Sequence, residues 1–188
     1  MAPRPNLQLD RDRLVVAAFA QLEEDGLDGL SMRKLAARIG VQAPALYWHV
    51  GDKAELLGLM AREIYAPAYA ASPEAVHWRD WLLGFGRALR AAFARYRDGA
   101  QLCALAQAPQ GRDVADHAAQ IAAPLVARGL DQKRALSCLA SVISFALGWA
   151  SFEANGPMHD YLDEMLDFDQ SFETGLAALV RGFEEVTS

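Results

Sequence analysis

The chain has 188 residues, of which 53% are hydrophobic and 22% are charged, and its net charge is −6. Enough apolar side chains are present to fill a core, which excludes general disorder. Ala and Leu are abundant, and no stretch alternates β-branched with polar residues at a period of two, so we expect an all-α fold.

The negative charge lies mainly in the second part of the chain. Eight basic and nine acidic residues precede Tyr65, whereas ten basic and fifteen acidic residues follow it. A local basic surface near the N-terminus is therefore compatible with a nucleic-acid partner. Its members are expected to be Arg4, Arg11, Arg13, Arg33, Lys34, Arg38 and Lys53.

The two cysteines, Cys103 and Cys138, have neither the spacing of a metal site nor that of a short disulfide loop. The first residues lack the apolar core of a signal peptide. We therefore expect a cytoplasmic protein with two reduced, buried thiols. No zinc pair and no phosphate-binding Gly loop occurs among the four His and 14 Gly, so we expect no bound metal and no cofactor.

Residues 1–9 contain two prolines and no periodicity, which predicts a flexible arm that carries Arg4. Asp10 or Asp12 can open the first helix, which is expected to stop at Gly26. Its apolar stripe should cover the motif that follows, and it consists of Leu14, Val15, Ala18, Phe19 and Leu22.

Residues 31–53 are predicted to form two short helices joined by a tight turn. Gly40 breaks the first helix, and Pro44 begins the second. Such a pair is a helix-turn-helix, whose second helix enters the major groove of DNA. Leu46 and Trp48 are expected to anchor this second helix inward.

Small and polar residues of this motif are the candidates for contact with double-stranded DNA. Arg33 can read a guanine edge through two hydrogen bonds, and Gln42 can also read a base edge. Tyr47, His49 and Lys53 are better suited to phosphates. The predicted DNA-binding set is Arg33, Gln42, Ala43, Pro44, Ala45, Tyr47, His49 and Lys53.

The order of residues in the motif also follows a known pattern, made of Leu30-Ser31-Met32-Arg33-Lys34-Leu35-Ala36, Val41, Pro44, Leu46-Tyr47-Trp48-His49-Val50 and Lys53. It resembles the DNA-binding segment of the TetR family of repressors, most closely its tetracycline-repressor subgroup. That subgroup has a Gln and a Thr in contact with DNA where this chain has Ala43 and Ala45. An alanine side chain cannot form hydrogen bonds, so we expect a different operator sequence.

A longer helix, capped by Asp52 and running to Pro67, is predicted to link the motif to the rest of the chain. The Ala-rich stretch with Pro67 and Pro73 predicts a domain boundary between a DNA-binding domain, residues 1–66, and a second domain, residues 67–188. The resemblance implies that the second domain binds a small-molecule inducer and forms a homodimer. Movement of the linking helix would then change the spacing of the two DNA-binding heads.

The second domain is predicted to hold helices over residues 76–96, 114–128, 131–153 and 169–183, and a short helix that passes through residues 102–105 and runs to Pro109. Two further strings, His77-Trp78-x-Asp80-Trp81-Leu82 and Tyr96-Arg97-Asp98-Gly99-Ala100, extend the resemblance into this domain. An inducer pocket among these helices should be mainly apolar and aromatic. Its candidate residues, each of which could instead be ordinary core, are Tyr69, Phe85, Leu89, Cys103, Gln107, His117, Gln120, Phe145, Trp149 and Phe152.

The drug-and-magnesium site of the tetracycline-repressor subgroup is not preserved in this sequence. Cys103 stands where the subgroup has a metal-binding His, Phe85 replaces an Asn, and Leu89 replaces a Phe. Among the positions that match this site, only Gln120 is the same residue as in the subgroup. We therefore expect a more apolar or aromatic inducer that binds without a metal.

The segment between Arg134 and Glu153 contains 18 uncharged residues, near the lower limit for a membrane span. Its serines favour a buried helix of a soluble protein, so no membrane partner is expected. Small residues recur along one stripe where a partner helix can approach. Together with the last helix they predict a four-helix dimer interface, although both helices could pack within one chain. The predicted interface residues are Ser137, Ser141, Ser144, Gly148, Ser151, Phe172, Leu176, Leu179 and Phe183.

These observations and the resemblance together predict a homodimeric, non-enzymatic repressor that binds a palindromic operator and is released by an inducer. Two alternatives stay open: a dimeric DNA-binding protein without an inducer, and a helical enzyme that uses acidic residues 159–169. The charges of that segment recur every three or four residues, which is also typical of a solvated helix face.

Overall fold

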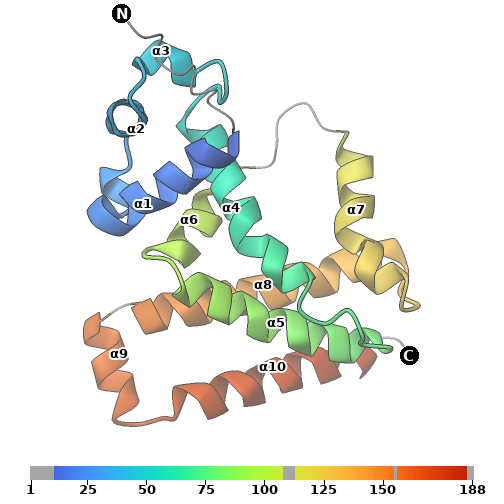
Figure 1. Cartoon of the computed structure of the whole chain (residues 1–188). Helices are drawn as coiled ribbons and strands as arrows, with labels where there is room; N and C mark the ends of the chain where they lie inside the picture. The colour runs from blue at the N-terminus through green and yellow to red at the C-terminus, as the bar shows by residue number, and fades with distance from the viewer. Residues whose placement is uncertain (1–10, 108–112, 155, 186–188) are drawn as a thin grey trace, which may run out of the picture.

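The computed structural model describes residues 11–107, 113–154 and 156–185, and every regular element within these ranges is a helix, as expected (Figure 1). The predicted arm of residues 1–9 lies outside the described residues. The helices are α1 (Arg11–Gly29), α2 (Met32–Ile39), α3 (Ala43–Leu46), α4 (Lys53–Tyr69), α5 (Trp78–Ala94), α6 (Gly99–Leu105), α7 (Val114–Val126), α8 (Gln132–Ala154), α9 (Gly156–Asp163) and α10 (Phe168–Glu185).

Helices α1 to α3 pack with the beginning of α4 into a small head (Figure 1). Gly40 ends α2 with a φ of 74°, a left-handed conformation that glycine adopts without steric cost. Pro44 lies in the first turn of α3, where its missing N–H costs nothing. The predicted pair of short helices is therefore present, and the core of the head includes the fully buried side chains Leu14, Leu35, Leu46 and Leu56.

Helix α4 connects the head to the second part of the chain and packs against α1, α5 and α6. Asp52 caps it as expected, because its side chain accepts a 2.8 Å hydrogen bond from the amide of Glu55. The expected end at Pro67 is wrong, since the helix continues to Tyr69. Ala68, only 1% exposed, holds this last turn against the core. The boundary proposed between residues 66 and 67 thus lies inside one continuous helix.

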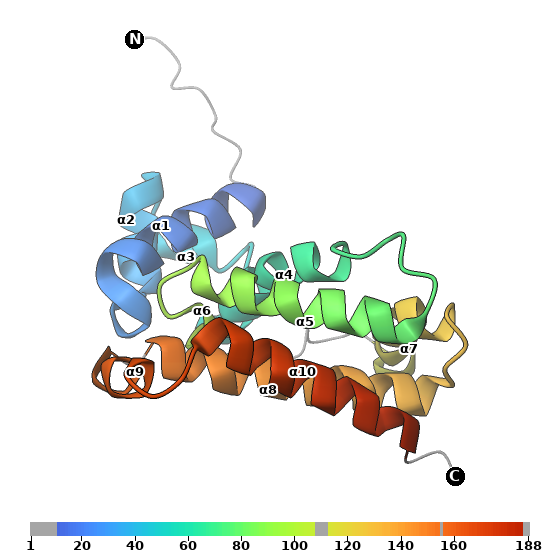
Figure 2. The same cartoon turned by 90° about the horizontal axis from the view of Figure 1, so that it is seen from below.

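Helices α5, α8 and α10 lie side by side and form the core of the second part (Figures 1 and 2). Gly86 of α5 permits the close approach. A Cβ atom at this position would lie 2.8 Å from Leu176 of α10 and 3.2 Å from Val142 of α8. Helix α7 covers another side of α8, so α8 has neighbours along much of its circumference.

Helix α8 is the one described helix that is long and apolar enough to span a membrane, with a mean hydropathy of 1.7. Its inner face packs against α5, α7 and α10, and Ala135, Val142 and Ala146 are fully buried there. A core helix of a soluble protein has the same length and composition, so this feature is weak evidence for a membrane span.

Candidate DNA interface and ligand cavity

The predicted DNA-binding residues gather at the end of the head formed by α2, α3 and the start of α4. The structure exposes five of these side chains: Arg33, Gln42, Pro44, Tyr47 and Lys53. The other three are half-buried: Ala43, Ala45 and His49. The arrangement presents a polar and aromatic edge of the kind that a helix-turn-helix lays into a major groove.

Trp48 does not anchor this edge, and the expectation that it points inward is wrong. Its side chain is 89% exposed, whereas Leu46 and Val50 are buried. Helix α3 has only one turn, and the amides of His49 and Val50 both donate to the carbonyl of Leu46. Helical spacing therefore does not extend to Trp48, and Val50 supplies the second inward contact.

Several basic side chains of the head are already paired with the head's own acids. Lys34 lies 3.1 Å from Asp25, and Arg38 pairs with Glu24. The Lys34 ammonium, with help from the Gln21 amide, holds the pKa of Asp25 below its usual value. Arg11 lies 3.5 Å from Glu55. Among the described parts of the chain, Arg33 and Lys53 are exposed cations with no such partner.

The far end of the head docks on the turn between α5 and α6. Phe19 of α1 stacks on Tyr96 with ring centroids 4.4 Å apart. Arg97 donates hydrogen bonds to the carbonyls of Glu23 and Glu24 at 3.1 and 3.0 Å. The head therefore contacts the second part of the chain through α1 as well as through α4.

Helix α1 bends at this contact instead of ending at Gly26 as expected. Gly26 adopts a φ of 71° and a ψ of 177°, and the helix resumes as far as Gly29. A Cβ atom on Gly26 would lie 3.1 Å from side-chain atoms of both Arg97 and Asp98. Glycine thus supplies the backbone conformation and leaves room for the docking turn.

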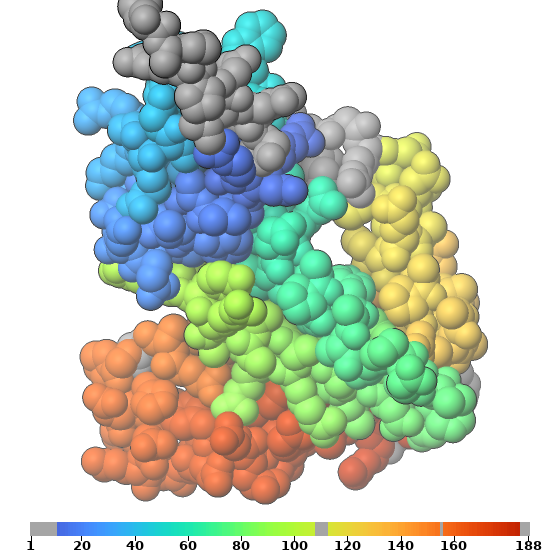
Figure 3. Space-filling model, in the orientation of Figure 1, coloured from blue at the N-terminus to red at the C-terminus, as the bar shows by residue number. Residues whose placement is uncertain are grey.

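A cavity of about 450 Å³ lies between α4, α6, α7 and α8, where the space-filling view is hollowed between α4 and α7 (Figure 3). Four residues of the predicted ligand set line it: Tyr69, Cys103, Gln107 and His117. Helix α4 forms one whole wall because its residues recur at helical spacing. The lining residues missed by the sequence analysis are Gly58, Ala61, Arg62, Tyr65, Ala66, Ala106, Ile121 and Ile143.

The other six predicted ligand residues do not line this cavity. Phe85 and Leu89 are completely buried in the core. Phe145 and Trp149 pack against Phe172 of α10, with ring centroids 5.3 and 5.9 Å from it. The remaining two are exposed, Gln120 and Phe152. Aromatic character alone could not distinguish a wall of the cavity from a core contact, because both need apolar groups.

Burial raises the pKa of three weakly acidic groups in the cavity wall. It raises the pKa of the Cys103 thiol to about 12 and that of the Tyr69 hydroxyl to about 12. Burial also raises the pKa of Tyr65 well above its ordinary value. Both cysteines of the chain are free, buried thiols, as expected from their spacing.

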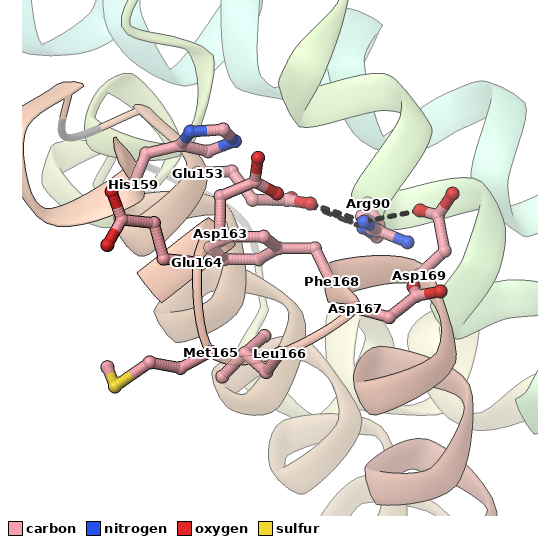
Figure 4. Close-up of a pocket in the computed structure, with 10 residues that line it drawn as sticks. All are labelled: Arg90, Glu153, His159, Asp163, Glu164, Met165, Leu166, Asp167, Phe168 and Asp169. Carbon is pink, nitrogen blue, oxygen red and sulfur yellow. Dashed lines mark hydrogen bonds and ion pairs between the residues drawn. The ribbon is translucent and has the colours of Figure 1, made fainter. Parts of the chain in front are cut away.

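A second, polar hollow of about 670 Å³ lies where α8, α9 and the start of α10 meet (Figure 4). The guanidinium of Arg90 reaches into it from α5 and binds Glu153 and, at 2.8 Å, Asp169. His159 stacks on Phe168 with ring centroids 4.7 Å apart. Across the described ranges, no three His, Cys, Asp or Glu side chains are arranged to hold a metal ion. The hollow is thus held together by ion pairs and stacking.

The small residues proposed for a dimer interface form an exposed stripe on α8. Ser137, Ser144, Gly148 and Ser151 are exposed, and Ser141 is half-buried. On α10 the proposed partners turn toward their own chain: Phe172 and Leu176 are 1% and 0% exposed, and Leu179 and Phe183 are partly buried. The described chain therefore leaves the α8 stripe open and uses the aromatic side of α10 internally.

Two family models match the chain. Residues 14–60 match the model of bacterial regulatory proteins of the tetR family, and residues 71–164 match the tetracyclin repressor-like C-terminal domain. The tetracycline repressor protein class A from transposon 1721 of Escherichia coli is 36% identical over 199 residues, covering 93% of this chain and 90% of that protein.

Solved structures agree with these matches. The class A TetR in complex with 5a,6-anhydrotetracycline and magnesium has a TM-score of 0.72 and 32% identity, covering 94% of this chain and 99% of that one. The TetR family protein ActR of Streptomyces coelicolor in complex with (S)-DNPA has a TM-score of 0.75 and 27% identity, with 100% of both chains covered.

Proposed function

Because the chain belongs to the TetR family and is a ligand-responsive, DNA-binding transcriptional repressor, we propose that it acts as a homodimer on a palindromic operator. In this proposal a small, largely apolar or aromatic inducer binds in the cavity between α4, α6, α7 and α8 and releases the DNA. The observation that carries the proposal is that one helix, α4, starts at the DNA-binding edge with Lys53 and ends in the cavity wall with Tyr69.

Helix α4 connects the DNA-binding edge directly to the cavity, so a movement at one end can reach the other. Residues at its start, such as Leu56, are buried in the head, whereas Ala61, Tyr65 and Tyr69 face the cavity. An inducer that displaces the cavity end would tilt the head. Two heads of a dimer fit successive major grooves only at a separation of roughly 34 Å. A coupling free energy of about 1–3 kcal/mol, the usual range, suffices for a large loss of operator affinity.

The proposed DNA contacts divide into those that read bases and those that position the head. Arg33 and Gln42 are exposed and can form hydrogen bonds to base edges. Tyr47, His49 and Lys53 are proposed to meet phosphates. Since Ala43 and Ala45 offer only methyl groups, the operator is proposed to differ from the operator of the tetracycline repressors.

The proposed dimer interface is centred on the exposed stripe of α8, with Ser144 and Gly148 near its middle. Small side chains allow a partner helix to approach closely, and two copies of the stripe are self-complementary about a two-fold axis. On α10 the interface would use the face opposite the buried aromatic residues. That face carries the exposed residues Thr174, Ala178 and Arg181.

The donor atoms of the cavity do not suit magnesium, the ion named for the class A TetR complex. Magnesium prefers hard oxygen ligands, particularly carboxylates, and no carboxylate is found among the described residues that line the cavity. Cys103 presents a protonated thiol, which is a poor ligand for such an ion. We therefore propose an inducer that binds without magnesium.

Selection of bound sequences from a random DNA pool tests this function, followed by mobility-shift assays with the selected site and a small-molecule library. A palindromic site that is released by at least one compound is expected. A palindrome that no compound releases would favour a DNA-binding protein without an inducer.

The relatives are transcriptional regulators, and the acidic segment 159–169 is proposed to have no catalytic role. Its replacement by Asn and Gln should leave DNA binding and release unchanged.

A further inference from the structure

Among the described residues, the wall of the cavity between α4, α6, α7 and α8 carries one permanent positive charge and no carboxylate. Arg62 is the charged member, and none of the described lining residues is Asp or Glu. The hydroxyl of Tyr69 and the thiol of Cys103, which also line the cavity, are uncharged at neutral pH already at their ordinary pKa values, and burial raises both pKa values further, to about 12. The field inside the cavity therefore attracts an anion and repels a cation.

Arg62 has no ion-pair partner among the described residues. Other arginines of the second part are engaged: Arg87 binds Glu173 through two nitrogens, and Arg90 binds Glu153. The neighbouring carboxylate in sequence, Glu63, is not part of the cavity wall. The guanidinium of Arg62 thus keeps its planar set of donors available, and that set matches the oxygens of a carboxylate or sulfonate.

His117 supplies a second polar atom that the protein leaves unsatisfied. Its Nδ1 is buried and has no hydrogen-bond partner in the described structure. A buried polar atom without a partner costs free energy, so a ligand atom that bonds to it gains affinity. The nearby Asp113 is not such a partner, because its carboxylate accepts hydrogen bonds from the backbone amides of Ala115 and Asp116 and thereby caps α7.

We propose that the inducer carries an acidic group, recognised by Arg62 and His117, on an aromatic or other apolar body that lies along the tyrosines of α4. This proposal rests on the proposed function, because it takes the cavity to be the inducer site. Arg62 is exposed and marks the rim, whereas Cys103 lies deeper and is 7% exposed. The acidic group therefore lies between Arg62 at the rim and the buried Nδ1 of His117, and the apolar body points toward Ile121 and Ile143.

Two fluorescent probes that differ only in an acidic group test the proposal on the full chain. The first is 8-anilinonaphthalene-1-sulfonate, and the second is N-phenyl-1-naphthylamine, the same ring system without the sulfonate. The sulfonate probe is expected to bind more tightly. Arg62→Gln should weaken its binding about tenfold, a typical effect of losing a charge-assisted hydrogen bond. The same variant should leave binding of the neutral probe unchanged.

Matched variants test whether binding of the sulfonate probe depends on Arg62, on His117 and on the cavity. Arg62→Lys should restore much of the sulfonate affinity, and Arg95→Gln, which removes the same charge from the exposed residue that follows α5, should have no effect. His117→Phe should weaken sulfonate binding, whereas His117→Asn keeps a polar atom near the Nδ1 position and should weaken it less. Ile121→Trp, which fills the cavity, should abolish binding of both probes while circular dichroism shows an intact helical fold.

Three results would overturn the proposal: equal affinity for the two probes, sulfonate binding that survives Arg62→Gln, or binding of neither probe. The proposed function fails by a different measurement. If Ile121→Trp leaves release from the selected operator by an active library compound unchanged, the cavity is not the inducer site. Retained release by neutral compounds only, and by none of the acids tested, would contradict the acidic group while leaving the inducer site in place.

Discussion

The backbone amide of Leu27 donates a 2.8 Å hydrogen bond to Oδ2 of Asp98, which ties the bent end of α1 to the turn between α5 and α6. Asp98 is the one non-glycine residue with a positive φ, 54°, in the described parts of the chain. A left-handed aspartate is held at a cost in free energy, and here the cost coincides with a contact between the two parts of the molecule. The head is thus held at two places, the turn between α5 and α6 and helix α4.

The contact predicts the behaviour of two substitutions at Asp98. Asp98→Ala removes the acceptor and leaves Leu27 without its partner, so the free energy of unfolding should fall by about 1–3 kcal/mol. Asp98→Asn keeps an acceptor oxygen and a side chain that tolerates the left-handed region, so it should lose less. Urea denaturation measures both. Asp163→Ala, at an exposed position, serves as the control, and equal losses for Asp98→Ala and Asp98→Asn would contradict a role for the hydrogen bond.

Specific DNA binding should depend on Arg33 and Tyr47. The double variant Arg33→Ala, Tyr47→Ala is expected to abolish the footprint on the selected operator, because one bidentate base contact alone is worth about 1–3 kcal/mol. Lys34→Ala should have a smaller effect, since Lys34 is already paired with Asp25 at 3.1 Å. Circular dichroism checks that the fold is retained. An unchanged footprint for the double variant would refute the proposed reading edge.

A different result is expected for Lys53, which is proposed to contact a phosphate. Such a contact releases counterions from the DNA, so its contribution to affinity depends on the salt concentration. Lys53→Ala should weaken binding to all DNA sequences by a similar factor. It should also make the slope of log K against log salt concentration smaller in magnitude by about 0.9. Titrations at several salt concentrations on selected and random DNA measure this. A loss confined to the selected operator would indicate a base contact instead.

The exposed stripe of α8 predicts the effect of a bulky charge at the dimer interface. Ser144→Arg should shift the sedimenting species from the dimer to a 20.5 kDa monomer, because the interface requires close helix approach. Ala91→Arg, at an exposed site on α5, should leave the dimer intact. A wild-type protein that sediments as a stable monomer at micromolar concentration would refute the homodimer itself.

The buried thiol and hydroxyls of the cavity predict a loss of stability in alkali. Cys103 and Tyr69 have pKa values raised to about 12, above the ordinary values of 9.0 and 10.0, so the unfolded chain releases these protons at lower pH than the folded chain. The free energy of unfolding should therefore decrease as pH rises from about 9 toward 12. Denaturation curves at several pH values measure the slope. Cys103→Ala and Tyr69→Phe should flatten it, whereas Tyr161→Phe, at an exposed site, should not.

Much of the head could be predicted because its determinants are local. Asp52 caps α4, Gly40 ends α2, and Pro44 enters α3 through interactions within a few residues of each position. The position of Trp48, in contrast, depends on contacts between helices. Helical spacing placed it inward, but α3 ends after one turn, and the packing of Leu46 and Val50 against the other helices decided which side chains are buried.

By itself, the sequence determined the all-helical fold, the DNA-binding motif and the presence of an apolar helix at α8, since each depends on residue type and spacing along one segment. Only the tertiary structure decided which residues line the cavity. Arg62 and His117 lie on different helices far apart in sequence, and their common cavity depends on how α4, α6, α7 and α8 cross. Likewise, the packing of α10 on α5 and α8 decided that Phe172 is a core residue and that the small-residue stripe of α8 remains exposed. Periodicity defines the faces of a helix, but which face meets which neighbour depends on contacts between distant segments.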